Sequence, residues 1–127
     1  MIKKFILAIL FTLVLSGGAY ATITNKDLLN YKNLKTNSEK EKEFHRNVIY
    51  SYLLGAGDSY LATNAVLEIK GEKKLFCQPG ELTLNVENLI TFAEEQIEMQ
   101  KKDGTFIEEA PLSATLLMRL KKIFPCK

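Results

Sequence analysis

Residues 39–62 read EKEKEFHRNVIYSYLLGAGDSYLA, and the spacing of their apolar side chains indicates the fold class. Apolar residues recur about every four positions, as they do on one face of an α-helix. Ser38 precedes the segment and Glu41 follows three positions later, a pattern that begins helices. We therefore expect a helix from about Glu39 to Ala62. The face expected to be buried consists of Phe44, Val48, Tyr52, Ala56 and Tyr60, flanked by Ile49 and Leu53.

Gly55 and Gly57 lie inside this predicted helix. Each glycine in a helix interior costs roughly 1 kcal/mol relative to alanine. Such a cost suggests that another backbone approaches closely at this point, or that the helix bends.

Shorter helices are predicted on both sides of the central one. Thr24 and Asp27 have the spacing of a capping box, before a short amphipathic pattern that contains Leu28, Leu29, Tyr31 and Leu34. After an irregular connection over residues 66–78, a helix is expected from about Asn85 to Lys102. Its apolar stripe consists of Val86, Leu89, Ile90, Ala93 and Ile97.

The end of the chain predicts one more helix. Asp103 and Gly104 form a stop signal, and Pro111 occupies a position favoured at the start of a helix. No alternating pattern of β-strands is visible. The fold class expected is therefore all-α, a small bundle of about four helices held by one disulfide.

The first 21 residues have the form of a secretion signal. Lys3 and Lys4 precede an apolar run from Phe5 to Leu15, and Ala19-Tyr20-Ala21 matches a cleavage site. The run is shorter than the roughly 20 residues that span a membrane. We expect cleavage after Ala21, export to the periplasm, and a single domain over residues 22–127 that is no longer attached to the membrane.

Cys77 and Cys126 are the only cysteines, and they lie in an exported chain. A structural disulfide is the pairing we expect, with a reactive thiol or a metal ligand as the alternatives. A reactive thiol needs a group that stabilises the thiolate, and the single histidine, His45, is distant in sequence. A zinc site needs more ligands than two cysteines.

No catalytic constellation is evident. Gly55-Ala56-Gly57-Asp58-Ser59 lacks the last glycine and the preceding strand of a dinucleotide site, and His45 is too far along the same helix to activate Ser59. The leader holds two of the 17 basic residues and none of the 15 acidic ones, so the exported chain is nearly neutral. We expect a binding protein that is not an enzyme, without cofactor, metal or nucleic-acid partner.

From Tyr52 onward the chain resembles the Rap/Tai immunity proteins of type VI secretion. The matching segments are Tyr52-Leu53-Leu54-Gly55 with Asp58, Phe76-Cys77-Gln78-Pro79, Ala110-Pro111-Leu112-Ser113-Ala114 and Phe124-Pro125-Cys126, in that order. They cover roughly residues 40–127. The second cysteine pair that members of this family often carry is absent, and Ser51 replaces a glycine.

This resemblance implies a helical, usually dimeric protein that inhibits a secreted peptidoglycan amidase by occluding its active site. The toxin-binding element we expect is the loop after the third helix: Asp103, Gly104, Thr105, Phe106, Ile107, Glu108 and Glu109. Phe106 would fill a pocket as an anchor, unless it folds back on the core. Residues 68–78 are the rival element. The alternative functions are a periplasmic helical chaperone or an inhibitor of another cell-wall hydrolase.

Overall fold

The computed structural model describes residues 22–80 and 83–127, so the predicted signal peptide lies outside the described residues. Four helices make up this part: α2 (Asn25–Lys32), α3 (Glu39–Ile69), α4 (Val86–Asp103) and α5 (Leu112–Ile123). Within the described ranges there is no strand, only an isolated bridge between Thr24 and Pro111. The expected all-α architecture is confirmed.

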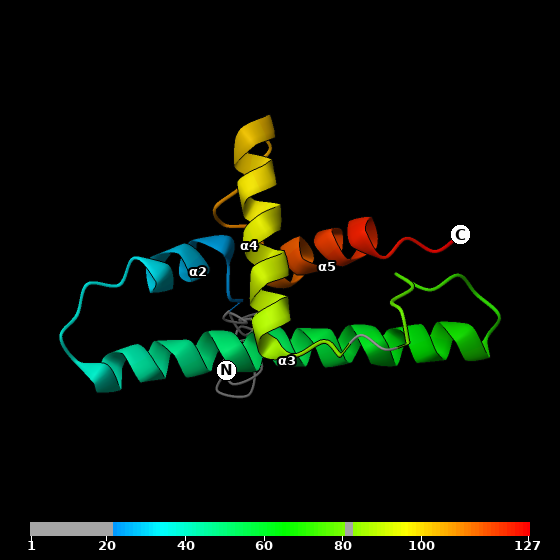
Figure 1. Ribbon diagram of the computed structural model, residues 1–127, viewed down its shortest axis with the longest axis horizontal. Helices are drawn as coiled ribbons and strands as arrows, with labels where there is room; N and C mark the ends of the chain where they lie inside the picture. The colour runs from blue at the N-terminus through cyan, green and yellow to red at the C-terminus, as the bar shows by residue number, and fades with distance from the viewer. Residues whose placement is uncertain (1–21, 81–82) are drawn as a thin grey trace, which may run out of the picture.

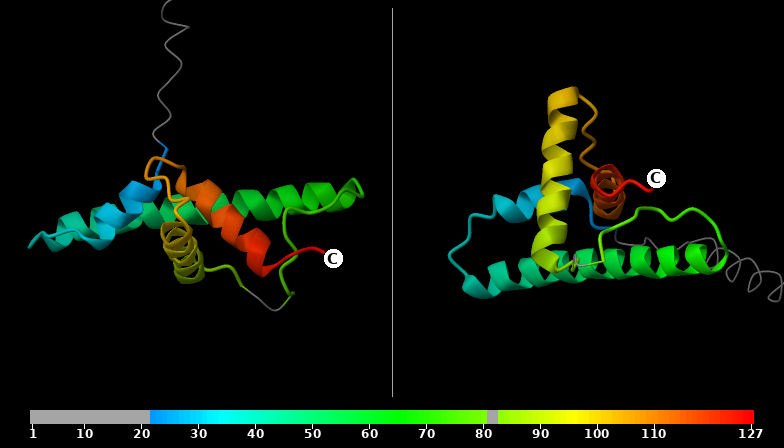
Figure 2. Two further views of the ribbon diagram at one scale, coloured as in Figure 1. Left: turned by 90° about the horizontal axis from the view of Figure 1, so that it is seen from above. Right: turned by 45° about the vertical axis from the view of Figure 1, so that its right-hand side comes forward.

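The helices are arranged around α3, which forms one long edge of the molecule (Figure 1). The other three described helices all lie on the same side of it, and α4 rises steeply away from its middle. Viewed from above, α5 starts over α3 beside α2 and slants away from α3 on the side where α4 stands (Figure 2). The C-terminal end of α4 is therefore the part of that helix farthest from α3.

The predicted caps form at the starts of α2 and α3 and at the end of α4. The side chains of Thr24 and Asp27 complete a capping box at the start of α2. Ser38 accepts a hydrogen bond from the Glu41 amide at the start of α3. At the end of α4, Gly104 adopts a left-handed conformation with φ of 78°, which glycine tolerates without a steric penalty.

Helix α3 continues two turns beyond its predicted end at Ala62 and stops at Ile69. Gly71 ends it with φ of 69°. The Gly71 amide bonds to the Glu68 carbonyl and the Glu72 amide to the Leu67 carbonyl, at 3.0 and 2.8 Å. This pair of bonds is a Schellman motif. The segment 66–69, which we expected in the connection, is therefore the last turn of the helix.

The buried face of α3 is displaced from the predicted one. Ile49 and Leu53 are buried as expected, but Phe44 and Val48 are 64% and 36% exposed. Because four residues advance a helix by about 400°, a row with strict four-residue spacing rotates by about 40° at each step. Phe44 and Tyr60 therefore cannot share a face. Tyr52, Ala56 and Tyr60 are half-buried against the core, and the fully buried positions are Ile49, Leu53, Gly57 and Asn64.

Helix α4 packs on α3 at Gly57. A Cβ atom added at Gly57 would stand 3.1 Å from Cδ1 of Leu89, a side chain that is 1% exposed. The close approach at Gly57 is therefore made by a side chain of α4 and not by another backbone. At Gly55 no atom lies within 4 Å of the corresponding position, so that glycine is not required by packing inside the chain.

Helices α4 and α5 pack together over the core. Their outer edge carries an ion pair between Arg119 and Glu95, with a shortest distance of 2.6 Å. Near the end of α5, the rings of Phe92 and Phe124 meet edge to face. The buried core residues are Leu28, Ile49, Leu53, Phe76, Leu89, Ala93, Ile97, Leu112, Leu116 and Leu120.

The connection between α3 and α4 is attached to the body at two places. Cys77 and Cys126 form the expected disulfide, and the Cys77 amide bonds to the Phe124 carbonyl. The Asn64 side chain accepts from the Leu75 amide and donates to the Phe76 carbonyl, at 2.7 and 3.0 Å. These bonds hold Phe76 in the core.

We predict opposite effects at the two glycines of α3. Gly55→Ala should raise the free energy of unfolding by about 0.5–1 kcal/mol, because alanine costs less backbone entropy and meets open space. Gly57→Leu should lower the free energy by about 1–3 kcal/mol, because it overpacks the contact with Leu89. Urea unfolding of dilute protein measures both. Equal stability of the two variants would contradict the packing of α4 on Gly57.

Removal of the disulfide should destabilise the protein without unfolding it. On the chain-entropy model, a disulfide that closes the loop between Cys77 and Cys126 stabilises the folded protein by about 4 kcal/mol. For Cys77→Ala/Cys126→Ala we expect a smaller loss, because Asn64 still holds the connection. Urea unfolding of this variant, beside one that also carries Asn64→Ala, measures the two contributions. A double-alanine variant as stable as the unchanged protein would contradict the expectation.

Candidate functional site

The loop of residues 103–110 begins at Asp103, the last residue of α4, and descends from the far end of that helix to the start of α5 (Figure 1). It contains all seven residues predicted to bind a toxin. Its first turn is built locally, since the Asp103 carboxylate accepts hydrogen bonds from the amide and hydroxyl of Thr105. The Thr105 amide also contacts the Gln100 carbonyl, at 2.9 Å.

The start of the described chain holds the second half of this loop. The amides of Asn25 and Lys26 donate to the carbonyls of Ala110 and Glu108, both at 3.0 Å. The Asn25 side chain, which is 0% exposed, donates to the Ile107 carbonyl at 3.0 Å. These bonds fix the backbone of a loop that would otherwise have few hydrogen-bond partners.

Asn25 is the loop-positioning residue that the sequence analysis missed. An asparagine in the first turn of a predicted helix carries no signal for a contact with a segment 82 positions away. Only the tertiary fold brings the start of α2 beside the loop. The pattern around Thr24 identified the helix correctly but gave no information about which distant segment the helix contacts.

The side chains of the loop divide into two groups. Phe106 is half-buried and packs against the core, and the Lys101 ammonium lies 5.5 Å from its ring centroid. Ile107 is 63% exposed. Phe106 thus folds back as in the alternative we considered, and Ile107 is the apolar side chain that the loop presents to solvent.

The two acids that follow are also exposed. Lys26 lies 3.3 Å from Glu109 and 4.0 Å from Glu108. Exposed pairs of this kind contribute little to stability. The pairs leave most of the acidic surface beside Ile107 available, with one lysine at its edge.

The rival segment, residues 68–78, is a structural connection. Phe76 is 1% exposed in the core, and the adjacent Cys77 is covalently joined to Cys126. Lys74 pairs with Glu68 across the turn. Its one largely exposed apolar side chain, Ile69, belongs to the last turn of α3, and residues 70–78 present no exposed large apolar side chain.

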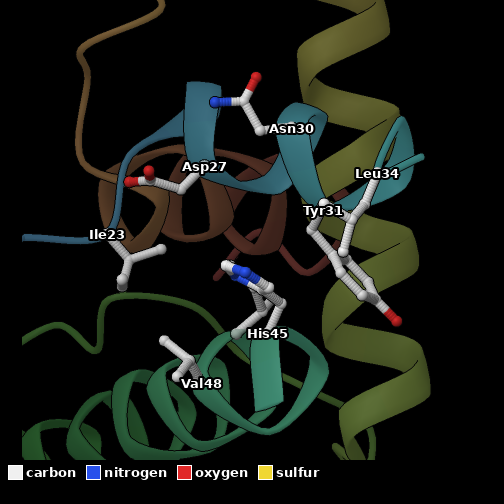
Figure 3. Close-up of a pocket in the computed structure, with 8 residues that line it drawn as sticks. Ile23, Asp27, Asn30, Tyr31, Leu34, His45 and Val48 are labelled. Atoms are coloured by element: carbon white, nitrogen blue, oxygen red, sulfur yellow. The ribbon is translucent and has the colours of Figure 1, made fainter. Parts of the chain in front are cut away.

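His45 lies at a small cavity of about 190 Å³ between α2 and α3 (Figure 3). Its ring points toward α2, and Tyr31 and Leu34 line the same space. The Asp27 carboxylate at this cavity already accepts the amide and hydroxyl hydrogens of Thr24, at 2.7 and 2.9 Å. It therefore serves the helix cap.

Ser59 makes no catalytic contact with His45. Its hydroxyl donates to the Gly55 carbonyl one turn earlier in α3, at 2.8 Å. In the described ranges, no group of three or more His, Cys, Asp or Glu side chains could hold a metal ion. The cysteines, which we weighed as metal ligands, form the disulfide instead.

A second arrangement of polar groups joins α3 to the start of α5. The Tyr52 hydroxyl donates to Oγ of Ser113, and the Tyr60 hydroxyl donates to the Ser113 carbonyl. Burial raises the pKa of Tyr60 above its ordinary value. Both tyrosine hydroxyls thus donate hydrogen bonds that fix α5 on α3.

Comparison with known proteins finds no matching family model, no similar curated protein and no similar solved structure. The resemblance to the Rap/Tai proteins therefore stays a prediction that rests on the sequence motifs.

The turn at the start of the loop should be sensitive to acid. Hydrogen bonds from Thr105 lower the pKa of Asp103 below its ordinary value of 3.8. Because the folded pKa is lowered, the stabilisation is complete above about pH 3.8 and is lost as pH falls through the folded pKa. An NMR titration of the Thr105 amide should give a midpoint below 3.8.

Thr105→Val is the matched control for this titration, because it removes the hydroxyl donor and keeps the side-chain shape. Its midpoint should move up toward 3.8. A midpoint at or above 3.8 in the unchanged protein would contradict the hydrogen-bonded turn.

Proposed function

We propose that this protein is an exported immunity protein that binds and inhibits a secreted peptidoglycan amidase by occluding its active site. The observation that carries the proposal is the loop at 103–110, whose backbone is held by Asn25 and Lys26 while Ile107 remains 63% exposed. The motifs shared with the Rap/Tai proteins supply the class of target.

A loop held in this way suits inhibition by insertion. A segment that is already ordered loses little conformational freedom on binding, so more of its contact energy appears as affinity. Ile107 would enter the apolar part of the amidase groove. Glu108 and Glu109 would meet a basic rim or the catalytic histidine, which gives electrostatic selectivity.

The proposed location is the periplasm. An oxidising compartment suits the disulfide between Cys77 and Cys126, and the N-terminal residues have the pattern of a signal peptide. Among the described residues, no helix is both long and apolar enough to cross a membrane.

The proposal predicts stoichiometric inhibition that depends on Ile107. The purified protein should abolish hydrolysis of peptidoglycan by the amidase encoded beside it, at a ratio near one to one, and have no hydrolase activity itself. Ile107→Ala should weaken binding by at least about 2 kcal/mol, or roughly 30-fold, if this side chain is the anchor. Calorimetric titration measures the affinity.

Leu54→Ala is the control variant, because Leu54 is an exposed aliphatic residue on α3 at 41% exposure and far from the loop in sequence. It should bind as tightly as the unchanged protein. Phe106→Ala is a less direct probe, since this side chain also packs against the core. An adjacent amidase that the protein ignores, or full affinity in Ile107→Ala, would count against the proposal.

A periplasmic chaperone is the second candidate, and one observation favours it. Of the nine exposed large apolar side chains in the described residues, six lie on α3. A chaperone would suppress aggregation of unrelated unfolded proteins through this surface. If the protein does not suppress such aggregation but does inhibit one amidase, the result favours the immunity function over the chaperone function.

A further inference from the structure

The start of α5 lies over the middle of α3 (Figure 2), and a shallow groove of about 510 Å³ runs beside their contact. Three serines, two tyrosines, one glycine and one alanine line this groove, and none of them is charged. Its volume is within the roughly 300–1,000 Å³ that is typical of small-molecule sites. A ligand that fits this lining is uncharged, because an ionic group would lose hydration and meet no opposite charge.

Gly55 forms part of the groove and is not explained by packing inside the chain. A glycine in a helix interior costs roughly 1 kcal/mol relative to alanine. Apart from its own helical turn, no atom lies within 4 Å of the position where a Cβ would stand. Glycine is also used where a ligand approaches the backbone closely. Gly55 therefore leaves room in the groove for a molecule that is not part of this chain.

The aromatic side chains of the groove are held in position. The Tyr52 hydroxyl donates to Oγ of Ser113, and the Tyr60 hydroxyl donates to the Ser113 carbonyl. Each ring is half-buried, so part of it remains accessible. The face of an aromatic ring carries negative charge density and attracts C–H groups, which are slightly positive. Because the rings are already fixed, a ligand that packs on them does not have to order them.

The serines supply the polar groups of the groove. A hydroxyl can donate one hydrogen bond and accept two. Among the described residues, the hydroxyls of Ser51 and Ser113 donate to no acceptor, and that of Ser113 accepts from Tyr52. The Ser59 hydroxyl donates to the Gly55 carbonyl and keeps its capacity to accept. The groove therefore offers uncharged donors and acceptors beside an aromatic surface.

We propose that this groove binds an uncharged saccharide. Sugar rings combine hydroxyl groups that both donate and accept with C–H faces that pack on aromatic rings, and the lining matches both features. A hydrocarbon chain would leave the serine hydroxyls without partners. A polypeptide strand would bring amides and carbonyls that need partners, and the backbone groups of α3 are already paired within the helix. The inference rests on the groove and not on the proposed function.

NMR titration of the isotope-labelled, processed chain tests the proposal. Chitotetraose and cellotetraose are the probes, because both are uncharged sugars and only the first carries acetamido groups. We expect at least one of them to shift the amide signals of Gly55, Ser59 and Ser113 in a saturable way. The dissociation constant should be on the order of 1 mM, because a shallow groove contacts only one side of the ligand.

Two variants and one control locate the sugar in the groove. Gly55→Leu fills the open space at this position and should weaken binding at least about tenfold. Ser51→Ala removes one hydroxyl and should weaken binding about three- to tenfold. Ala62→Leu is the matched control, because it places the same side chain at an exposed position of α3 outside the groove, and it should bind normally. Thermal midpoints no lower than that of the unchanged protein show that the variants are folded.

Three results would overturn the proposal. The first is the absence of shifts with both sugars up to about 20 mM. The second is unchanged affinity in Gly55→Leu, which would place the sugar elsewhere. The third is a response to an uncharged peptide of glycine and serine but to neither sugar, which would assign the groove to a polypeptide. Because the titration needs no amidase, its failure would leave the proposed immunity function standing.

Discussion

The crossing of α4 over α3 at Gly57 is the constraint on which the rest of the structure depends. Because Gly57 has no side chain, Leu89 can approach α3 closely, and α4 can rise steeply from the middle of the long helix. Helix α5 then packs on α4 and places its last turn where Cys126 reaches Cys77. The same geometry carries the C-terminal end of α4 away from α3, where the loop at 103–110 begins.

This arrangement separates two surfaces with different properties. The loop at 103–110 is held by Asn25 and presents one apolar and two acidic side chains. Helix α3 carries six of the nine exposed large apolar side chains of the described residues. We propose that the first surface is the one that meets an enzyme.

Local signals in the sequence predicted much of the fold. The features that these signals did not predict depend on packing between distant segments. The caps at Thr24 and Gly104 were identified because their residue types act within one turn. The burial of Phe44 was predicted wrongly, because a row with strict four-residue spacing winds around the helix and does not stay on one face. The exposure of Ile107, the half-burial of Phe106 and the role of Asn25 depend on contacts across the bundle, which no local pattern encodes.

Hydrogen–deuterium exchange of the protein, alone and with the amidase encoded beside it, tests the central claim most directly. Such exchange reports which backbone amides lose contact with solvent when a complex forms. At constant protein concentration, our account predicts new protection over residues 103–110 and little change along α3. Protection confined to α3, with the loop at 103–110 unchanged, would contradict it.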